Sequence, residues 1–373
     1  MIHIKKCIVL MVFCSMAGVF FTSPAFASIT LTDSAGKTLM LDKLPQRLVV
    51  VGAGPYIPLH MLYMFEETKE RLKGFEVKYK MKDEFLELID PKLSLKQTLD
   101  TNPGPESVAS LKPDLVIMKA TSEGNLARSL KALGIPVLHV APETPELFFK
   151  DIENLGKILG NEERSKTIVQ YYKDKLSLIK DKVGALAPGE KSRVLVLEYN
   201  NRGNALSLNV PAMGWFQTQQ ALISGGNPVW LDSLTVSDGW QITGFEQVAA
   251  WNPDKIFLIV WYQLKGPAVV KGFYEDSKWS RLKALQKKEL HLFPQDIFGW
   301  DSATPRWILG TLWMAKMTYP DKFGPDKSES GKSEPGKPGK EVLDINRTVK
   351  EFFKILYRFD DATIEQHLMP RQE

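Results

Sequence analysis

The chain has little cysteine, and what it has lies at the start. Cys7 and Cys14 are its two cysteines among 373 residues, and both fall inside a segment with the features of a secretory signal. The sequence after residue 27 is therefore predicted to carry no disulfide and no thiol chemistry. Long apolar runs are equally scarce, because after residue 27 none reaches the length that a bilayer crossing needs.

Residues 1–27 have the three parts of a secretory signal. Two lysines give a basic start, an almost wholly apolar run follows, and Ala25-Phe26-Ala27 has the small-x-small form of a cleavage site. A membrane anchor is the alternative, but the apolar run is short and ends in Thr-Ser-Pro. A lipid on Cys14 is disfavoured because Phe13 stands where a small residue is required. We expect cleavage after Ala27 and a free protein in the periplasm.

Excess charge and catalytic motifs are missing as well. The formal net charge of +4 falls to +2 without the two signal lysines, which predicts no nucleic-acid partner and no membrane-surface binding. There is no Gly-x-Ser-x-Gly motif, no paired-histidine zinc motif and no cysteine cluster. His139 and His291 lie in predicted strands and are expected in the core rather than on a metal. We predict no enzyme activity, no cofactor and no metal site.

The pattern that is present is an alternation of strands and helices. About 345 residues after the signal are too many for one typical core, so two domains are expected. Strand patterns alternate with amphipathic helix patterns, which indicates an α/β fold with a parallel sheet. The predicted strands include 47–52, 135–140, 193–198 and 289–293, and the predicted helices include 127–133, 144–159, 216–224, 307–317 and 342–357.

The segment from Asn161 to Leu186 predicts one long helix near the middle of the chain. Asn161 is a suitable N-cap, and apolar residues recur every three or four positions from Ile168 onwards. About 25 residues would span almost 40 Å. A long surface helix of one domain is possible on this pattern. We favour a rigid linker helix at 161–187 that joins two α/β lobes with central sheets, at 28–160 and 188–373.

Two glycine-containing motifs are not interpreted as nucleotide sites. The strand 47–52 leads into Gly52-Ala-Gly54, but Ile57 stands at the third glycine position of a dinucleotide-binding motif. The Ser-Gly-Lys-Ser sequence lies in a flexible charged loop at 324–340 and follows no buried strand. A weak internal repeat is more informative: Glu106 and Glu246 each begin a short helix that is followed by Pro-Asp and a strand.

These pieces resemble a known family, the periplasmic binding proteins of ABC importers for iron–siderophore, haem and corrinoid complexes. The resemblance runs from about Ile29 to Tyr319 and rests on the order and spacing of short motifs. Two features depart from the family: the 324–340 loop has the character of an insertion, and the expected pocket regions are poor in arginine. The motifs are Asp33-Ser-Ala-Gly36, Pro45-Gln-Arg47, Leu111-Lys-Pro-Asp-Leu-Val116, Leu133-Gly-Ile-Pro-Val137, Gly225-Gly-Asn227, Trp251-Asn-Pro-Asp254, Trp300 and Leu309-Gly310.

The resemblance also implies site residues. One glutamate on each lobe would dock onto arginines of the permease, and Glu106 and Glu246 stand in the matching motifs; the alternative is that each merely favours its helix N-terminus. Ligands of α/β sheets bind beyond the carboxyl ends of the strands, which points to loops such as 199–202 and 298–306. Aromatic and arginine side chains there would hold a chelate, although each aromatic could equally pack in the core. The predicted ligand-binding residues are Tyr56, Arg202, Trp215, Trp240, Trp261, Tyr262, Trp300 and Arg306.

The resemblance therefore implies a periplasmic receptor, expected to act as a monomer. It would capture a ferric siderophore, haem or corrinoid between its lobes and deliver it to an inner-membrane ABC permease and its ATPase. A receptor for a bare metal ion or an oxyanion is the alternative within transport. An envelope enzyme on the same fold is the alternative from another class, and turnover of a substrate would distinguish it.

Overall fold

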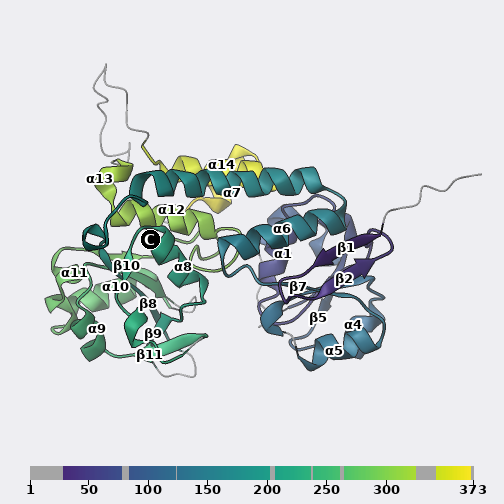
Figure 1. Ribbon diagram of the computed structural model, residues 1–373, viewed down its shortest axis with the longest axis horizontal. Coiled ribbons are helices and arrows are strands. Elements are labelled where there is room, and N and C mark those ends of the chain that lie inside the picture. Colours follow the sequence, from purple (N-terminus) through teal and green to yellow (C-terminus); the bar gives the residue numbers. More distant parts are fainter. Residues whose placement is uncertain are drawn as a thin grey trace, which may run out of the picture.

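Two lobes lie side by side beneath a long helix in the computed structural model (Figure 1). The structure describes residues 28–77, 84–122, 124–201, 206–236, 238–260, 264–324 and 342–370. The predicted signal at 1–27 lies outside these residues, as does the predicted 324–340 loop apart from Gly324.

The first lobe, called the N-lobe here, is built on a parallel five-stranded sheet in the order β5-β4-β3-β6-β7. Its central strand β3 is short and fully buried, as expected of a β-branched run covered on both faces. A separate antiparallel hairpin, β1 (Ile29–Thr32) and β2 (Thr38–Leu41), precedes the sheet. The sheet strands are β3 (Leu48–Val50), β4 (Leu72–Glu76), β5 (Gln97–Leu99), β6 (Leu115–Lys119) and β7 (Val137–Val140), and the helices are α1 (Tyr56–Leu62), α2 (Thr68–Arg71), α3 (Glu84–Ile89), α4 (Pro105–Ser110), α5 (Asn125–Ala132) and α6 (Pro145–Leu159).

The second lobe, the C-lobe, has a mixed sheet in the order β11-β9-β8-β12-β13, with β10 beside β8. Strands β8, β12 and β13 are parallel, whereas β9 returns antiparallel to β8 and β11 antiparallel to β9. The mixed edge was not foreseen, because β9 and β11 are short and carry polar residues. The strands are β8 (Arg193–Asn200), β9 (Ser207–Pro211), β10 (Asn227–Pro228), β11 (Trp240–Thr243), β12 (Lys255–Val260) and β13 (Leu290–Leu292), and the helices are α8 (Phe216–Ile223), α9 (Phe245–Trp251), α10 (Gly266–Glu275) and α11 (Lys283–Gln286).

Three helices, α7 (Glu162–Val183), α12 (Trp307–Thr318) and α14 (Ile345–Tyr357), pack together across the top of both lobes, and we call them the spine. The structure has a helix at the predicted position, α7, and the Asn161 side chain caps it by accepting from the Arg164 amide at 3.1 Å. Its role as a rigid linker stays a prediction. The helix ends at Val183, short of the expected residue 187. Two shorter helices, α13 (Pro320–Phe323) and α15 (Asp361–Thr363), complete this region.

Hydrogen bonds tie the spine helices to one another and to the N-lobe. The Arg164 guanidinium at the N-terminal end of α7 donates to the carbonyls of Ile355 and Leu356 near the end of α14, at 2.8 and 2.7 Å. The Tyr357 hydroxyl of α14 donates to the His60 carbonyl in the N-lobe at 3.0 Å. Residues that follow the C-lobe in the sequence therefore pack on the N-lobe. Separating the lobes would break the buried Tyr357–His60 bond and the packing of α14, so we infer that the lobes move little relative to one another.

The N-terminal hairpin is held to its lobe by a buried cluster of acids. Asp33 in the hairpin turn accepts from Nδ1 of His139 at 2.7 Å. Asp151 of α6 accepts from the Ser34 hydroxyl and from the Ala141 amide, the latter at 2.8 Å. Burial raises the pKa of Asp151 from 3.8 to about 7, against the opposing hydrogen bonds. The folded protein therefore keeps a proton on Asp151 at pH values where the unfolded chain has released it.

This cluster predicts that stability falls as the pH rises. Because the folded pKa of Asp151 is raised, its stabilising proton is fully present below about pH 4 and is lost as the pH passes through about 7. At about 1.4 kcal/mol for each pH unit, the loss amounts to a few kcal/mol. We expect Asp151→Asn to flatten the pH dependence of urea unfolding between pH 4 and 8, whereas Asp181→Asn at an exposed site leaves it unchanged. An unaltered slope in Asp151→Asn would contradict this assignment.

Candidate ligand-binding site

A tight loop at the carboxyl end of β3 forms the N-lobe side of the candidate cleft. The Gly52 amide donates to buried Glu76 Oε2 at 2.6 Å, and the Ala53 amide donates to Ser122 Oγ at 2.5 Å. Gly52 has a φ of +101°, and a Cβ there would lie 2.7 Å from Ser122 Oγ. Glycine is therefore required for β3 and β6 to end this close together. The loop places Tyr56 in the first turn of α1.

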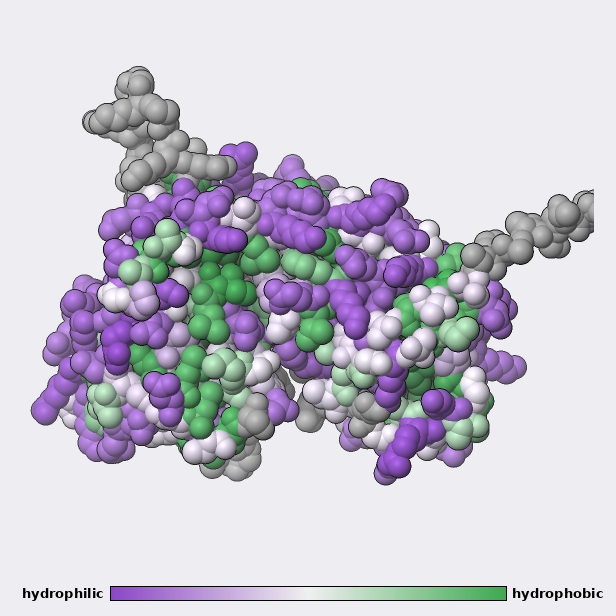
Figure 2. All heavy atoms as spheres, viewed as in Figure 1, coloured by the Kyte–Doolittle hydropathy of each residue, from purple (hydrophilic) through white to green (hydrophobic). Residues whose placement is uncertain are grey.

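An aromatic contact joins the two lobes next to this loop, where Tyr56 meets Phe298. Phe298 lies at the tip of a short turn after β13, where Gln295 and Gly299 form a β-bridge. Its ring centroid is 4.9 Å from that of Tyr56 and 5.1 Å from that of His60. Tyr56 and Phe298 are half-buried, so each ring keeps exposed surface. Figure 2 shows the molecular surface notched between the lobes on the side away from the spine.

Carboxylates gather at the carboxyl edge of the C-lobe sheet. Glu198 of β8 is buried and accepts from the side-chain amides of Asn200 at 2.7 Å and Asn209 at 3.0 Å. Burial, together with the nearby Glu198 charge, raises the pKa of Asp301 to about 6. Two neighbouring acids at this edge favour a ligand that presents hydrogen-bond donors or positive charge to the C-lobe.

Trp300 and Arg306 lie in the core, which differs from the sequence expectation that they contact ligand. Both are 0% exposed. The Trp300 indole donates to Asp296 at 3.1 Å, and Nε of Arg306 lies 2.9 Å from both Asp296 oxygens. The loop after β13 folds back on itself and presents Phe298 instead. The sequence showed that this loop follows a strand, but it could not show which of its side chains turn inward.

Trp215 and Trp240 form a separate aromatic pair in the C-lobe. Their ring centroids are 5.7 Å apart at an interplanar angle of 63°. Trp240 pairs with Pro211 at one end of β9, whereas the other end of β9 meets the carboxyl end of β8. Four residues of strand, or roughly 13 Å, separate the two ends. A ligand role for Trp215 and Trp240 stays a prediction.

The remaining expected ligand residues lie outside the described residues and stay predictions: Arg202, Trp261 and Tyr262. Phe298 and Glu198 were not among the residues predicted to bind the ligand. A signal for both existed, because Glu198 ends a buried strand pattern and Phe298 begins the 298–306 loop that was expected to reach the ligand. Within the described part of the chain, no group of three or more His, Cys, Asp or Glu is placed to hold a metal ion.

The two expected docking glutamates occupy matching units, one on each lobe. Glu106 lies in the first turn of α4 and Glu246 in the first turn of α9, and both are exposed. Two residues after each, Val108 and Val248 are 0% exposed and anchor the helices. In Figure 1, α4 and α9 lie on the side of their lobes away from α7. The two helices that carry these exposed glutamates therefore lie on the same side of the molecule.

The two helices α4 and α9 are also followed by turns of the same kind. Lys112 and Asn252 have positive φ, at +49° and +43°. Asp114 then accepts from the backbone amide of Arg47 at 2.8 Å, and Asp254 from that of Arg193 at 3.0 Å. Each arginine side chain in turn donates to the end of the short helix beside it. The structure confirms the weak internal repeat that the sequence suggested.

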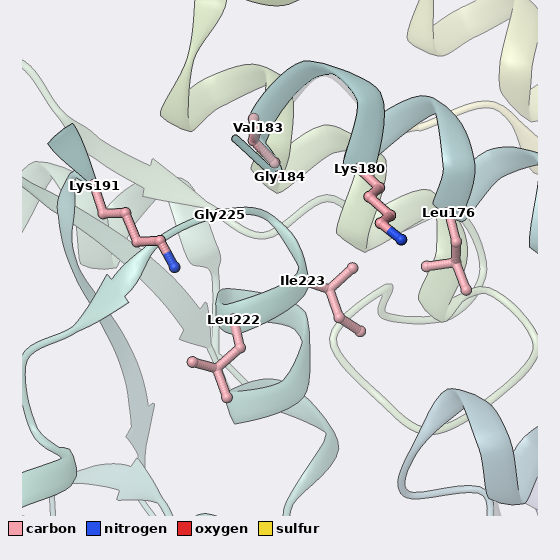
Figure 3. Close-up of a pocket in the computed structure, with 8 residues that line it drawn as sticks. All are labelled: Leu176, Lys180, Val183, Gly184, Lys191, Leu222, Ile223 and Gly225. Carbon is pink, nitrogen blue, oxygen red and sulfur yellow. The ribbon is translucent and has the colours of Figure 1, made fainter. Parts of the chain in front are cut away.

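A hollow of about 290 Å³ lies elsewhere, between the C-terminal half of α7 and the end of α8 (Figure 3). Its lining includes Leu176, Lys180 and Ile223, none of which takes part in the inter-lobe contact.

None of the helices in the described ranges combines the length and the apolarity that a membrane span needs.

The known proteins that this chain resembles are binding proteins of transport systems. A family model described as periplasmic binding protein matches residues 69–297, which is more than half of the chain. The molybdate-binding protein MolA of Haemophilus influenzae is 22% identical over 278 residues, or 68% of this chain and 69% of that protein. MolA is the cognate binding protein of an ABC transporter. Its structure with bound molybdate has a TM-score of 0.68 at 17% identity, and the match covers 92% of this chain and 100% of that chain.

Two further solved structures share the fold. A periplasmic solute binding protein from Veillonella parvula has a TM-score of 0.69 at 24% identity, covering 91% of this chain and 97% of that chain. CeuE of Helicobacter pylori, in a Ni-His complex, has a TM-score of 0.66 at 17% identity, covering 91% and 98%. At these identities the likeness supports the two-lobed fold, and the named ligands belong to those proteins.

Proposed function

The chain belongs to the family of periplasmic binding proteins, and from that premise we propose that it captures a metal chelate between its lobes for an ABC importer. The chelate would be a ferric siderophore, haem or corrinoid. The receiving partners would be an inner-membrane permease and its ATPase. The observation that carries the proposal is the Tyr56–Phe298 contact, since it places two partly exposed rings, one from each lobe, at the carboxyl edges of both sheets.

Aromatic rings contributed by both lobes are suited to bind a flat or apolar chelate. Such rings contribute large apolar area with few rotatable bonds, and they stack on ligand π-systems. On the C-lobe side the half-buried Asp301 would accept hydrogen bonds from donor groups of the ligand, and the buried charge of Glu198 beside it would favour such donors. Capture of this kind makes and breaks no covalent bond, which agrees with the lack of a catalytic motif in the sequence.

An oxyanion receptor is the second candidate, because a molybdate-binding protein is among the relatives. Molybdate would need cationic or hydrogen-bond-donating side chains. Lys119 lies at the carboxyl end of β6, but it is already paired with Glu143. The Glu198–Asp301 pair would repel an anion on the opposite side. The described residues at the cleft therefore favour the chelate over the oxyanion.

Removal of either inter-lobe ring is expected to weaken binding. With ferric siderophore, haemin, cobalamin and molybdate as probes, we expect saturable quenching of tryptophan fluorescence by a chelate. Tyr56→Ala and Phe298→Ala should each cost about 1–3 kcal/mol of binding free energy. Trp215→Ala serves as the contrast, because its ring packs on Trp240, whereas Tyr56 and Phe298 pack on each other.

The same titrations distinguish the alternatives. Loss of binding in Trp215→Ala with normal binding in Tyr56→Ala and Phe298→Ala would move the ligand to the C-lobe edge. Saturable binding of molybdate alone would replace the chelate by an oxyanion. Mass spectrometry and absorption spectra of protein purified with its native ligand would then identify the chelate directly.

A further inference from the structure

We propose that the hollow between α7 and α8 is a second binding site, for a small carboxylate with an apolar body. The hollow has a volume of about 290 Å³ and is lined mainly by aliphatic side chains and glycine backbone. This is near the lower end of the range for ligand pockets, about 300–1,000 Å³, so it fits a small molecule rather than a peptide helix. The residues that matter are Leu176, Lys180, Val183, Lys191, Leu222 and Ile223.

The two ends of the site carry positive charge. Figure 3 shows the side-chain nitrogens of Lys180 and Lys191 on opposite sides of Ile223. Both lysines are exposed, and none of the described residues that line the hollow carries a carboxylate. Neither lysine forms an ion pair with an acid among the residues that the structure describes. The charge is therefore available to an anionic head group.

Apolar surface between the lysines is also exposed. Leu222 is 39% exposed, and Leu176 and Ile223 are partly exposed beside it. Figure 2 shows apolar side chains gathered over α8 below α7. Water-exposed aliphatic groups next to unpaired ammonium groups match a ligand with an alkyl or aromatic body and one carboxylate.

The walls of the hollow are fixed in place. Gly225, with a φ of +81°, approaches Val183 so closely that an added Cβ would lie 2.8 Å from it. The Tyr319 hydroxyl donates to the Gly225 carbonyl at 2.8 Å and accepts from the Ser192 amide, next to Lys191, at 3.0 Å. Tyr319 thus joins both sides of the site. An occupant would contact α7 of the spine and α8 of the C-lobe at once, away from the Tyr56–Phe298 contact.

Decanoate and its uncharged analogue decanol are the probes that test this site, by calorimetry below the concentration at which decanoate forms micelles. We expect saturable decanoate binding, at least about tenfold weaker in Lys180→Glu/Lys191→Glu, because two attractive charges become repulsive. Decanol should bind about tenfold more weakly than decanoate. The matched charge control is Lys131→Glu/Lys157→Glu on the N-lobe, which should bind decanoate normally.

A second control separates this site from the cleft. Tyr56→Ala should bind decanoate like the parent, whereas it should lose affinity for the chelate. The proposal is overturned if decanoate shows no saturable binding, if the Lys180/Lys191 reversal leaves its affinity unchanged, or if decanol binds equally well. Loss of decanoate binding in Tyr56→Ala would assign the carboxylate to the cleft instead.

Discussion

Replacing Arg306 with alanine is expected to lower the free energy of unfolding by about 3–5 kcal/mol. Its guanidinium is 0% exposed, with Nε 2.9 Å from both oxygens of Asp296, which is also buried. The guanidinium carbon lies 3.9 Å from the ring centroid of Phe85, and Nη1 lies 3.3 Å from Nδ1 of His60. Removing Arg306 would leave the Asp296 carboxylate buried without its counter-charge. Urea unfolding followed by circular dichroism measures the loss.

Two further variants make the interpretation specific. Arg128→Ala removes an exposed arginine of α5 and should change stability by no more than about 0.5 kcal/mol. Arg306→Met/Asp296→Asn removes both charges and should recover part of the loss, because no unpaired charge remains. The Asn side chain can still accept from the Phe298 amide, as Asp296 does at 2.8 Å. A loss below about 1 kcal/mol in Arg306→Ala would show that the pair contributes little to the fold.

The second large effect is expected on delivery rather than capture. Glu106→Lys/Glu246→Lys should bind the chelate normally but reduce uptake in cells by more than about tenfold. Both carboxylates are exposed, on matching helices of the two lobes, and would meet basic groups of the permease. A lysine placed against basic groups of the permease would cost several kcal/mol of docking free energy, and each 1.4 kcal/mol or so weakens the docking affinity about tenfold. Charge reversal should therefore impair uptake more than alanine does, and the double variant should be worst.

A matched pair of reversals on another side of the molecule is the control for uptake. Glu153→Lys on α6 and Asp321→Lys on α13 also change two exposed acids, and we expect normal uptake from that double variant. Normal uptake in Glu106→Lys/Glu246→Lys would remove the docking role. Loss of chelate binding by a folded double variant would instead place these glutamates in the ligand site.

Local elements were predictable because their signals are local. The long helix, the helix at α8 and the buried strands β3, β8 and β12 follow from apolar periodicity within one segment. The paired units of Glu106 and Glu246 could be found because a short helix, a Pro-Asp turn and a strand recur in the same order. Their exposed glutamates followed as well, since an acid in the first turn of a helix anchored by a buried valine faces solvent.

The sequence by itself thus determined the α/β class, the long helix and the repeated units with their two exposed acids. It could not decide which loop side chains face the cleft, because that depends on how loops from distant strands fold against each other. Arg306 and Phe298 belong to one loop, yet the ion pair with Asp296 and the ring of Phe85 hold the arginine inside while the phenylalanine meets Tyr56 of the other lobe. Only the tertiary structure could assign these roles, since a buried charge is stable only where its partners converge.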